Sequence, residues 1–219
     1  VYMTIDISNN LDVFLETIPS TVELVAVSKT KPNDMIMEAY QAGQRHFGEN
    51  KIQEMTSKWE TLPKDIQWHM IGHVQTNKVK YMAPYVSLIH GVDREKLLNE
   101  INKQAFKNNR IIDCLLQVFI ANETTKFGLS PNEILPLIER SLSLKNIRVV
   151  GLMGMATFTQ DSEQIENEFK ILKELFFLAQ KKYNQINILS MGMSNDYQIA
   201  INQESNMIRI GSKIFGSRD

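Results

Sequence analysis

Several apolar runs of this 219-residue chain contain or are followed by residues that could do chemistry, namely a lysine, an arginine and two Gly-Ser motifs. Lys29 directly follows "VELVAVS" (residues 22–28), and Arg209 lies within "NMIRIGS" (206–212). A lysine amine held among apolar groups or beside a positive charge has a lowered pKa, which favours Schiff-base formation with an aldehyde. A charged arginine in an apolar strand needs a polar partner. Taken alone, a lysine at this position is more often a solvated surface charge, so the interpretation of Lys29 depends on which residues gather beside it.

The Gly-Ser pairs occur in "GMS" (192–194) and "RIGS" (209–212), each between an apolar run and a helical pattern. Glycine lets a ligand approach the backbone closely, and the start of a helix offers unpaired N–H groups. Serine adds a hydroxyl donor. Each pair alone is also an ordinary way to begin a helix. Together they predict a phosphate site at these two strand ends.

The elements that must position these residues follow a repeating order of strand and helix. Eight short and largely apolar runs, each followed by a helical pattern, indicate a parallel sheet covered by helices. We expect strands at 22–28, 45–50, 66–72, 86–93, 111–120, 147–155, 186–192 and 206–212, with helices at 33–43, 51–62, 75–85, 94–108, 131–143, 161–183, 195–203 and 213–217. An additional helix is expected at 6–18, and Asn33 and Gly43 are expected to cap and end the helix between them.

Eight such units predict a single α/β domain over residues 1–219, a closed (β/α)₈ TIM barrel with an extra N-terminal helix. An open doubly wound sheet is the alternative, although no G-x-G-x-x-G follows the first strand. In a barrel of this kind the active site forms at the carboxyl ends of the strands. Polar residues at those predicted ends are Lys29, Asn50, His69, His73, His90, Asn122, Lys126, Ser194, Arg209 and Ser212.

Some of these residues have structural interpretations of similar weight. His69 follows Trp68 and is equally expected as a hydrogen-bonded core histidine. His90 lies in "HGVD", which also makes a good turn, so we expect a structural role. Lys31 competes with Lys29 for the chemistry, but Pro32 indicates that the chain has left the sheet, and we expect Lys31 to be exposed.

Composition excludes several classes of function. The formal net charge is −1, so no global field attracts nucleic acid or an anionic membrane. No apolar run of about 20 residues predicts a membrane span, and the N-terminal segment lacks the features of a signal peptide. The single cysteine, Cys114, lies in an apolar run and is expected to be a small buried hydrophobe. We expect a cytoplasmic protein.

A lysine, a phosphate cradle and an arginine suit pyridoxal 5′-phosphate (PLP). Its aldehyde condenses with a lysine amine, its phosphate needs backbone donors, and its ring nitrogen needs a partner. An arginine beside that nitrogen repels the proton of a pyridinium, which makes the ring a weaker electron sink.

The motifs "AVSKTKP", "AGQRHFGENKIQE", "WHMIGHVQTNK", "GLMGMA", "LSMGMSNDYQIAI" and "RIGSKIFGSR" resemble the YggS/PROSC family of pyridoxal phosphate homeostasis proteins, from about residue 24 to residue 218. The resemblance implies a single barrel of the alanine racemase N-terminal-domain type. It implies that Lys29 forms the Schiff base with PLP, that Ser194, Gly211 and Ser212 hold the phosphate, that Arg209 lies near the pyridine nitrogen, that Asn50 lies near the 3′-oxygen, and that His69 and Met193 line the pocket.

The expected activity follows from what a racemase of this barrel type would need. Such an enzyme uses a second base that faces the lysine and comes from an additional domain, and we expect none here because this sequence ends at "GSRD". We therefore expect a monomeric protein that holds PLP as an internal aldimine and serves intracellular vitamin B6 homeostasis, with little or no catalysis. Delivery of PLP to apo-enzymes by transimination is a possible extension. The alternatives are a PLP-dependent amino acid racemase and an aldolase that uses Lys29 without a cofactor. We assign no catalytic and no metal-binding residue.

Overall fold

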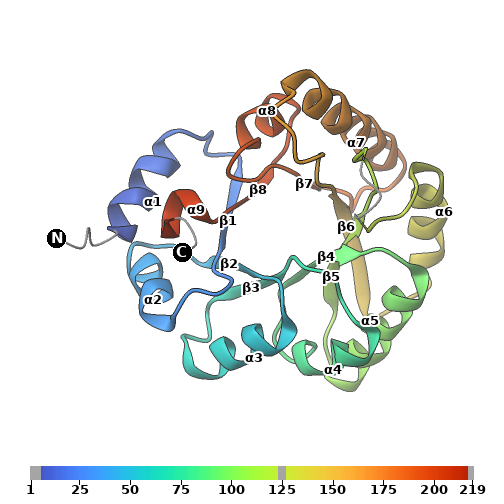
Figure 1. Cartoon of the computed structure of the whole chain (residues 1–219). Helices are drawn as coiled ribbons and strands as arrows, with labels where there is room; N and C mark the ends of the chain where they lie inside the picture. The colour runs from blue at the N-terminus through green and yellow to red at the C-terminus, as the bar shows by residue number, and fades with distance from the viewer. Residues whose placement is uncertain (1–5, 123–126, 217–219) are drawn as a thin grey trace.

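The computed structural model describes residues 6–122 and 127–216 and contains a closed barrel of parallel strands. Figure 1 shows the ring of strands along the barrel axis, surrounded by helices. The strands follow one another around the barrel in chain order, and β8 pairs with β1, with Arg209 opposite Val25. They are β1 (Glu23–Val27), β2 (His46–Glu49), β3 (Gln67–Met70), β4 (Leu88–Val92), β5 (Ile112–Gln117), β6 (Ile147–Met153), β7 (Ile188–Ser190) and β8 (Met207–Ile210). The predicted (β/α)₈ barrel is confirmed, and the open sheet is excluded.

The helices lie outside the ring, and α2 to α8 connect successive strands (Figure 1). They are α1 (Ile7–Glu16), α2 (Asn33–Gln41), α3 (Ile52–Thr61), the short η1 (Thr76–Lys78) with α4 (Val79–Met82), α5 (Glu95–Lys107), α6 (Pro131–Ser141), α7 (Ser162–Lys182), α8 (Tyr197–Asn202) and α9 (Ser212–Phe215). Helix α1 is the predicted extra N-terminal helix. It lies beside α9, and the Asn10 side chain donates a hydrogen bond to the Ile214 carbonyl at 3.1 Å.

Local sequence signals explain where the helices begin and end. Helix α6 starts with Pro131 after its N-cap Ser130, whose backbone N–H donates to Glu133 Oε2 at 2.8 Å, as in a capping box. Gly43 follows α2 with φ +103°, the left-handed conformation that ends helices. The expected cap at Asn33 is wrong by one position. Asn33 is the first helical residue, after Pro32, and its side chain donates instead to Thr61 Oγ1 at 2.9 Å.

Apolar side chains fill both the barrel and the space between strands and helices. The inner cluster consists of Val25, Leu88, Leu115, Val150, Met153 and Met207. The larger outer cluster includes Phe47, Trp68, Phe169 and Phe215, each fully buried. Cys114 is fully buried in β5, where burial raises the pKa of its thiol, so the expectation of a small buried hydrophobe is confirmed. Because apolar groups fill the barrel, polar groups inside it must find partners there.

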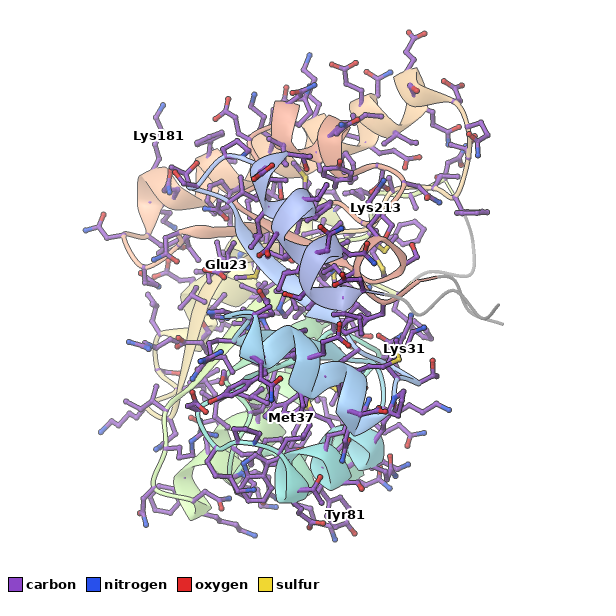
Figure 2. The ribbon with its side chains drawn as sticks, turned by 90° about the vertical axis from the view of Figure 1, so that its left-hand side faces the viewer. Glu23, Lys31, Met37, Tyr81, Lys181 and Lys213 are labelled. Atoms are coloured by element: carbon purple, nitrogen blue, oxygen red, sulfur yellow. The ribbon has the colours of Figure 1, made fainter. Side chains whose placement is uncertain are left out.

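The two ends of the barrel carry different parts of the chain. Figure 2 shows Glu23 and Lys181 on one side and Lys31 and Lys213 on the other. Glu23 begins β1 at the amino ends of the strands, and Lys31 follows β1 at the carboxyl ends. Over residues 6–122 and 127–216, no helix combines the length and apolar character needed to cross a membrane.

Candidate functional site

A cavity of about 590 Å³ opens at the carboxyl ends of the strands. It brings together every site residue predicted from the sequence except His69: Lys29, Asn50, Met193, Ser194, Arg209, Gly211 and Ser212 all line it. Other lining residues include Lys31, Gly72, His73, Gln117 and the segment 155–160. A volume of this size is typical of small-molecule sites. The residues proposed to carry the chemistry thus line one cavity.

Lys29 is half-buried at the end of β1, on a tight turn. The Lys31 backbone N–H donates to the Ser28 carbonyl at 3.0 Å, and Thr30 has φ +64°. This left-handed conformation is strained for a β-branched residue. The Thr30 N–H donates to Glu54 Oε1 at 2.6 Å, so a side chain from α3 stabilises the turn. The turn therefore directs Lys29 into the cavity on a fixed backbone.

A buried polar cluster beneath this turn was not predicted from the sequence. Lys58 Nζ donates to Glu49 Oε1 at 2.7 Å, to Glu54 Oε1 at 2.7 Å and to the Ser28 carbonyl at 2.8 Å. The Ser28 hydroxyl also donates to Glu49 Oε1, at 2.6 Å. Burial raises the pKa of Glu49, while the charge and hydrogen bond of Lys58 and the hydrogen bond from Ser28 oppose that rise. The cluster does not line the cavity. It fixes the backbone that carries Lys29 and Asn50.

Lys31 is not exposed as expected. It is half-buried, lines the cavity, and its Nζ donates to the Phe215 carbonyl at 3.1 Å. The turn at residues 28–31 explains the difference, because it folds the chain back over the barrel before Pro32 leads away. Lys31 therefore competes with Lys29 for any aldehyde in the cavity, and experiment must separate them.

The two Gly-Ser loops meet at the cavity wall. The Gly211 N–H donates to Ser194 Oγ at 3.4 Å, which joins the loop after β8 to the loop after β7. Gly192 has φ +103°, and a Cβ at this position would lie 2.7 Å from the Ala200 Cβ, so the turn requires glycine. Helix α9 begins at Ser212, whereas α8 begins only at Tyr197, after a turn. The Ser194 hydroxyl and the backbone N–H groups around Gly211 are suited to an anion.

Arg209 is the charged group deepest in the site. It is 3% exposed, and it donates from Nη1 to Ser190 Oγ at 2.5 Å and from Nη2 to the Gly154 carbonyl at 3.1 Å. Burial lowers the pKa of its guanidinium to about 10, so the side chain remains charged at neutral pH. The expectation that this arginine has polar partners is confirmed.

His69 does not lie at the cavity wall, contrary to what the resemblance implied. It is 2% exposed inside the barrel, with Nδ1 2.9 Å from His90 Nε2 and Nε2 2.9 Å from His46 Nδ1. The strand geometry gives the reason. Gly72 lines the cavity, and His69 lies three residues earlier, about 10 Å back along the chain. His69 is therefore the hydrogen-bonded core histidine that the sequence allowed as its alternative. His90 is also fully buried.

Of the other polar residues predicted at strand ends, some line the cavity and one lies at the surface. Asn50 lines the cavity against Gly72, where an added Cβ would lie 2.4 Å from the Asn50 carbonyl oxygen. His73 lines the mouth, stacks on Phe127 with ring centroids 4.1 Å apart, and lies 3.1 Å from Asp93. Asn122 is exposed and outside the lining set. Lys126 lies outside the described residues.

The loop after β6 contributes more to the cavity than the sequence suggested. Its residues 155–160 line the cavity, although the sixth strand was the one without a polar residue at its predicted end. The signal was present a few residues later, in "ATFTQ". The Thr157 hydroxyl and N–H both donate to Glu168 of α7, at 2.6 Å, which holds this loop against the barrel.

The fold and this site define the chain as a barrel of the alanine racemase N-terminal-domain class, and the family model described as "Alanine racemase, N-terminal domain" matches residues 5–219. A pyridoxal phosphate homeostasis protein from Aquifex aeolicus is 42% identical over 198 residues, covering 90% of this chain and 87% of that protein. The human protein of the same name is 41% identical over 211 residues, covering 90% of this chain and 76% of its own length. The chain belongs to the pyridoxal phosphate homeostasis protein family.

A solved structure supports the same assignment. PipY of Synechococcus elongatus PCC7942, solved without PLP, is 32% identical and superposes with a TM-score of 0.92, covering 96% of this chain and 100% of PipY. PipY with PLP bound superposes with a TM-score of 0.88 at the same identity and coverage.

Proposed function

We propose that this protein holds PLP in the cavity at the carboxyl ends of the strands, through a Schiff base on Lys29. The observation that carries the proposal is the convergence of three kinds of group on one cavity. These are the half-buried amine of Lys29, the joined loops of Ser194 and Gly211, and the buried guanidinium of Arg209. The relatives named for pyridoxal phosphate homeostasis, and PipY with PLP bound, support the choice of ligand.

The residues around the cavity fit the parts of PLP. Ser194, the Gly211 N–H and Ser212 are proposed to hold the phosphate, because they supply hydroxyl and backbone donors on two joined loops. Arg209 is proposed to face the pyridine nitrogen and Asn50 the 3′-oxygen, with Met193 on the wall. When bound, PLP supplies an aldehyde that a lysine amine can condense with.

The proposed role is to hold the cofactor and not to convert amino acids with it. Because Arg209 remains charged, it disfavours a proton on the pyridine nitrogen, and this weakens the ring as an electron sink. Among the described residues that line the cavity, none is a tyrosine or a cysteine that could face Lys29 as a second base. We propose that the chain serves vitamin B6 homeostasis as one PLP-binding domain, as a cytoplasmic monomer, and that apo-enzymes receive PLP from it.

Reduction and mass mapping test the site, the residue and the cofactor together. The protein is loaded with PLP, reduced with borohydride and digested, and the peptides are analysed by mass spectrometry. We expect a phosphopyridoxyl group on Lys29, loss of the visible Schiff-base absorption in Lys29→Ala, and its retention in the matched variant Lys31→Ala. A label on Lys31 with Lys29 unmodified would refute the assignment, and no label at all would refute PLP attachment. Rapid racemisation of an added L-amino acid would favour the enzyme alternative.

A further inference from the structure

A line of polar side chains crosses the barrel interior from its amino end to Arg209. We call Glu23, His46, His69, His90 and Ser190 the histidine relay. At the amino end of the barrel, Glu23 Oε1 lies 3.6 Å from His46 Nε2. The histidines then contact one another, with His46 Nδ1 2.9 Å from His69 Nε2 and His69 Nδ1 2.9 Å from His90 Nε2. At the other end, His90 Nδ1 lies 3.0 Å from Ser190 Oγ, which lies 2.5 Å from Arg209 Nη1. Figure 2 shows that Glu23 lies at the opposite end of the barrel from Lys31.

The inner members of the relay are neutral and sealed from solvent. His69 is 2% exposed, and His90 and Ser190 are fully buried. Burial, together with the positive charge a protonated His46 would carry, lowers the pKa of His69 to about 3, and burial also lowers the pKa of His90 well below its ordinary value. A neutral imidazole donates from one ring nitrogen and accepts at the other. Each histidine of the relay can therefore adopt either of two neutral tautomers, and the tautomer sets the direction of its hydrogen bonds.

The two ends of the line select one direction for its hydrogen bonds. Arg209 can only donate, so Ser190 Oγ accepts from it. At 3.6 Å the Glu23–His46 contact is electrostatic and not a hydrogen bond, but a carboxylate there favours a proton on His46 Nε2 over a lone pair. When His46 is neutral, its Nδ1 then accepts from His69 Nε2. By the same logic His69 Nδ1 accepts from His90 Nε2, and His90 Nδ1 accepts the Ser190 hydroxyl proton.

In this direction each donor in the line meets an acceptor. The reverse direction would place a lone pair of His46 against the Glu23 carboxylate, and the Ser190 hydroxyl proton would have to leave His90 for another acceptor. A row of aligned hydrogen bonds also polarises its members cooperatively. The Ser190 oxygen that faces Arg209 is therefore fixed both in place and in orientation by groups on β1, β2, β3 and β4.

We propose that the histidine relay positions Arg209, with Glu23 at the far end of the barrel selecting the Nε2–H tautomer of all three histidines. In the described part of the chain, the hydrogen bonds of the guanidinium go to two neutral oxygens, of Ser190 and Gly154, and Asp196 adds attraction through space. Its orientation thus depends on the Ser190 hydroxyl, whose direction depends on His90. The effect of this orientation on a pyridine nitrogen rests on the proposed function. The inference about the histidine tautomers does not rest on it.

Nitrogen-15 NMR of the ligand-free protein tests the relay directly, because ring nitrogens that carry a proton differ in chemical shift from those that do not. The chain has four histidines, and His73, at the cavity mouth and outside the relay, is the internal reference. At a pH where His46 is neutral, we expect His46, His69 and His90 as Nε2–H tautomers in the wild type, and appearance of Nδ1–H forms in Glu23→Gln. Asp113→Asn removes another carboxylate of the barrel, one that pairs with Arg148 at 2.7 Å, and should leave the tautomers unchanged.

A titration with PLP then measures whether the relay reaches the cavity. We expect Ser190→Ala to weaken PLP binding about tenfold, the loss of one hydrogen bond to a charged group, and Asp113→Asn to leave it unchanged. Nδ1–H forms of His69 or His90 in the wild type, or tautomers that do not respond to Glu23→Gln, would overturn the relay. Equal PLP affinity of wild type and Ser190→Ala would overturn its role in positioning Arg209. Failure of the wild type to bind PLP would refute the proposed function and leave the tautomer result to stand by itself.

Discussion

Ser194, after β7, accepts a hydrogen bond at 3.4 Å from the backbone N–H of Gly211, after β8. The contact is long for a hydrogen bond of this kind, whose ordinary N···O distance is about 2.9 Å. A loosely held donor can be redirected to a ligand at little cost. The pair therefore places a hydroxyl and an amide N–H side by side at the cavity wall, where a phosphate can take both.

Ser194→Ala tests this arrangement as the phosphate site. We expect the affinity for PLP to fall about tenfold to a hundredfold, because a hydrogen bond to a charged group contributes about 1.5–3 kcal/mol. The affinity for pyridoxal, which has the aldehyde and the ring but no phosphate, should be the same in wild type and variant. Equilibrium titration followed by Schiff-base absorption measures both. An equal loss for the two ligands would show that Ser194 acts on the fold of the loop and not on the phosphate.

Lys58→Met tests the buried cluster beneath the turn of Lys29. Removal of the ammonium leaves the fully buried Glu49 without its ionic partner, and we expect the free energy of unfolding to fall by about 3–5 kcal/mol. Urea denaturation measures this loss. The double variant Lys58→Met/Glu49→Gln should recover much of it, because no buried charge remains. Lys182→Met, which breaks an exposed pair with Glu139, is the matched control and should leave the midpoint unchanged. A similar stability of Lys58→Met and wild type would contradict the ionic pairing of Glu49.

The barrel could be predicted from the sequence because eight largely apolar runs alternate with helical patterns, and helices such as α2 and α6 have recognisable stop or start residues. Strand direction then placed Lys29, Asn50, Ser194 and Arg209 at one end, since parallel strands share their carboxyl ends. That prediction required no knowledge of register. Strand direction alone therefore predicts most of the residues that line the cavity. It does not predict the loop after β6, because the polar residues of that loop come after the strand end.

What could not be predicted depends on depth and on contacts between elements. The sequence does not tell how far below the cavity His69 lies, because depth follows from where β3 ends relative to β2 and β4. Lys58 has the pattern of an ordinary i, i+4 surface pair with Glu54, and only the packing of α3 on the barrel buries it against Glu49. The position of Lys31 over the cavity follows from a left-handed Thr30, which no local residue preference suggests.

Gly72→Ala tests the contact between the loops that follow β2 and β3. The new methyl group would lie 2.4 Å from the Asn50 carbonyl oxygen, so the Asn50 backbone must move. We expect weaker PLP binding, with a shifted Schiff-base absorption if Asn50 contacts the 3′-oxygen. Gly48→Ala is the matched control, because the atoms nearest to its methyl would be side-chain atoms, of Val25 at 3.0 Å and Ile71 at 3.1 Å, which can adjust. Equal binding by both variants and the wild type would show that the Asn50 loop does not contact the ligand.

The buried histidines predict how stability depends on pH. Burial holds the pKa of His69 at about 3 in the folded protein, and that of His90 is also well below its ordinary value, which for histidine is about 6.5. The unfolded chain therefore binds protons below about pH 6.5 that the folded protein does not. The resulting stability is fully present above pH 6.5 and is lost as the pH falls toward the folded-state pKa.

Each buried histidine should contribute a loss of up to about 1.4 kcal/mol per pH unit in the free energy of unfolding. In the interval from pH 6.5 to 5.5, carboxylates with ordinary pKa values stay ionised and contribute little. The pKa of Glu49 is raised by burial, so its contribution opposes that of the histidines. Urea denaturation at several pH values measures the slope. His69→Gln should be less stable at every pH, since it interrupts the hydrogen bonds between His46 and His90, but its slope should be about half that of the wild type. A wild-type stability that stays constant from pH 7 to 5.5 would show that His69 and His90 are not held neutral by the fold.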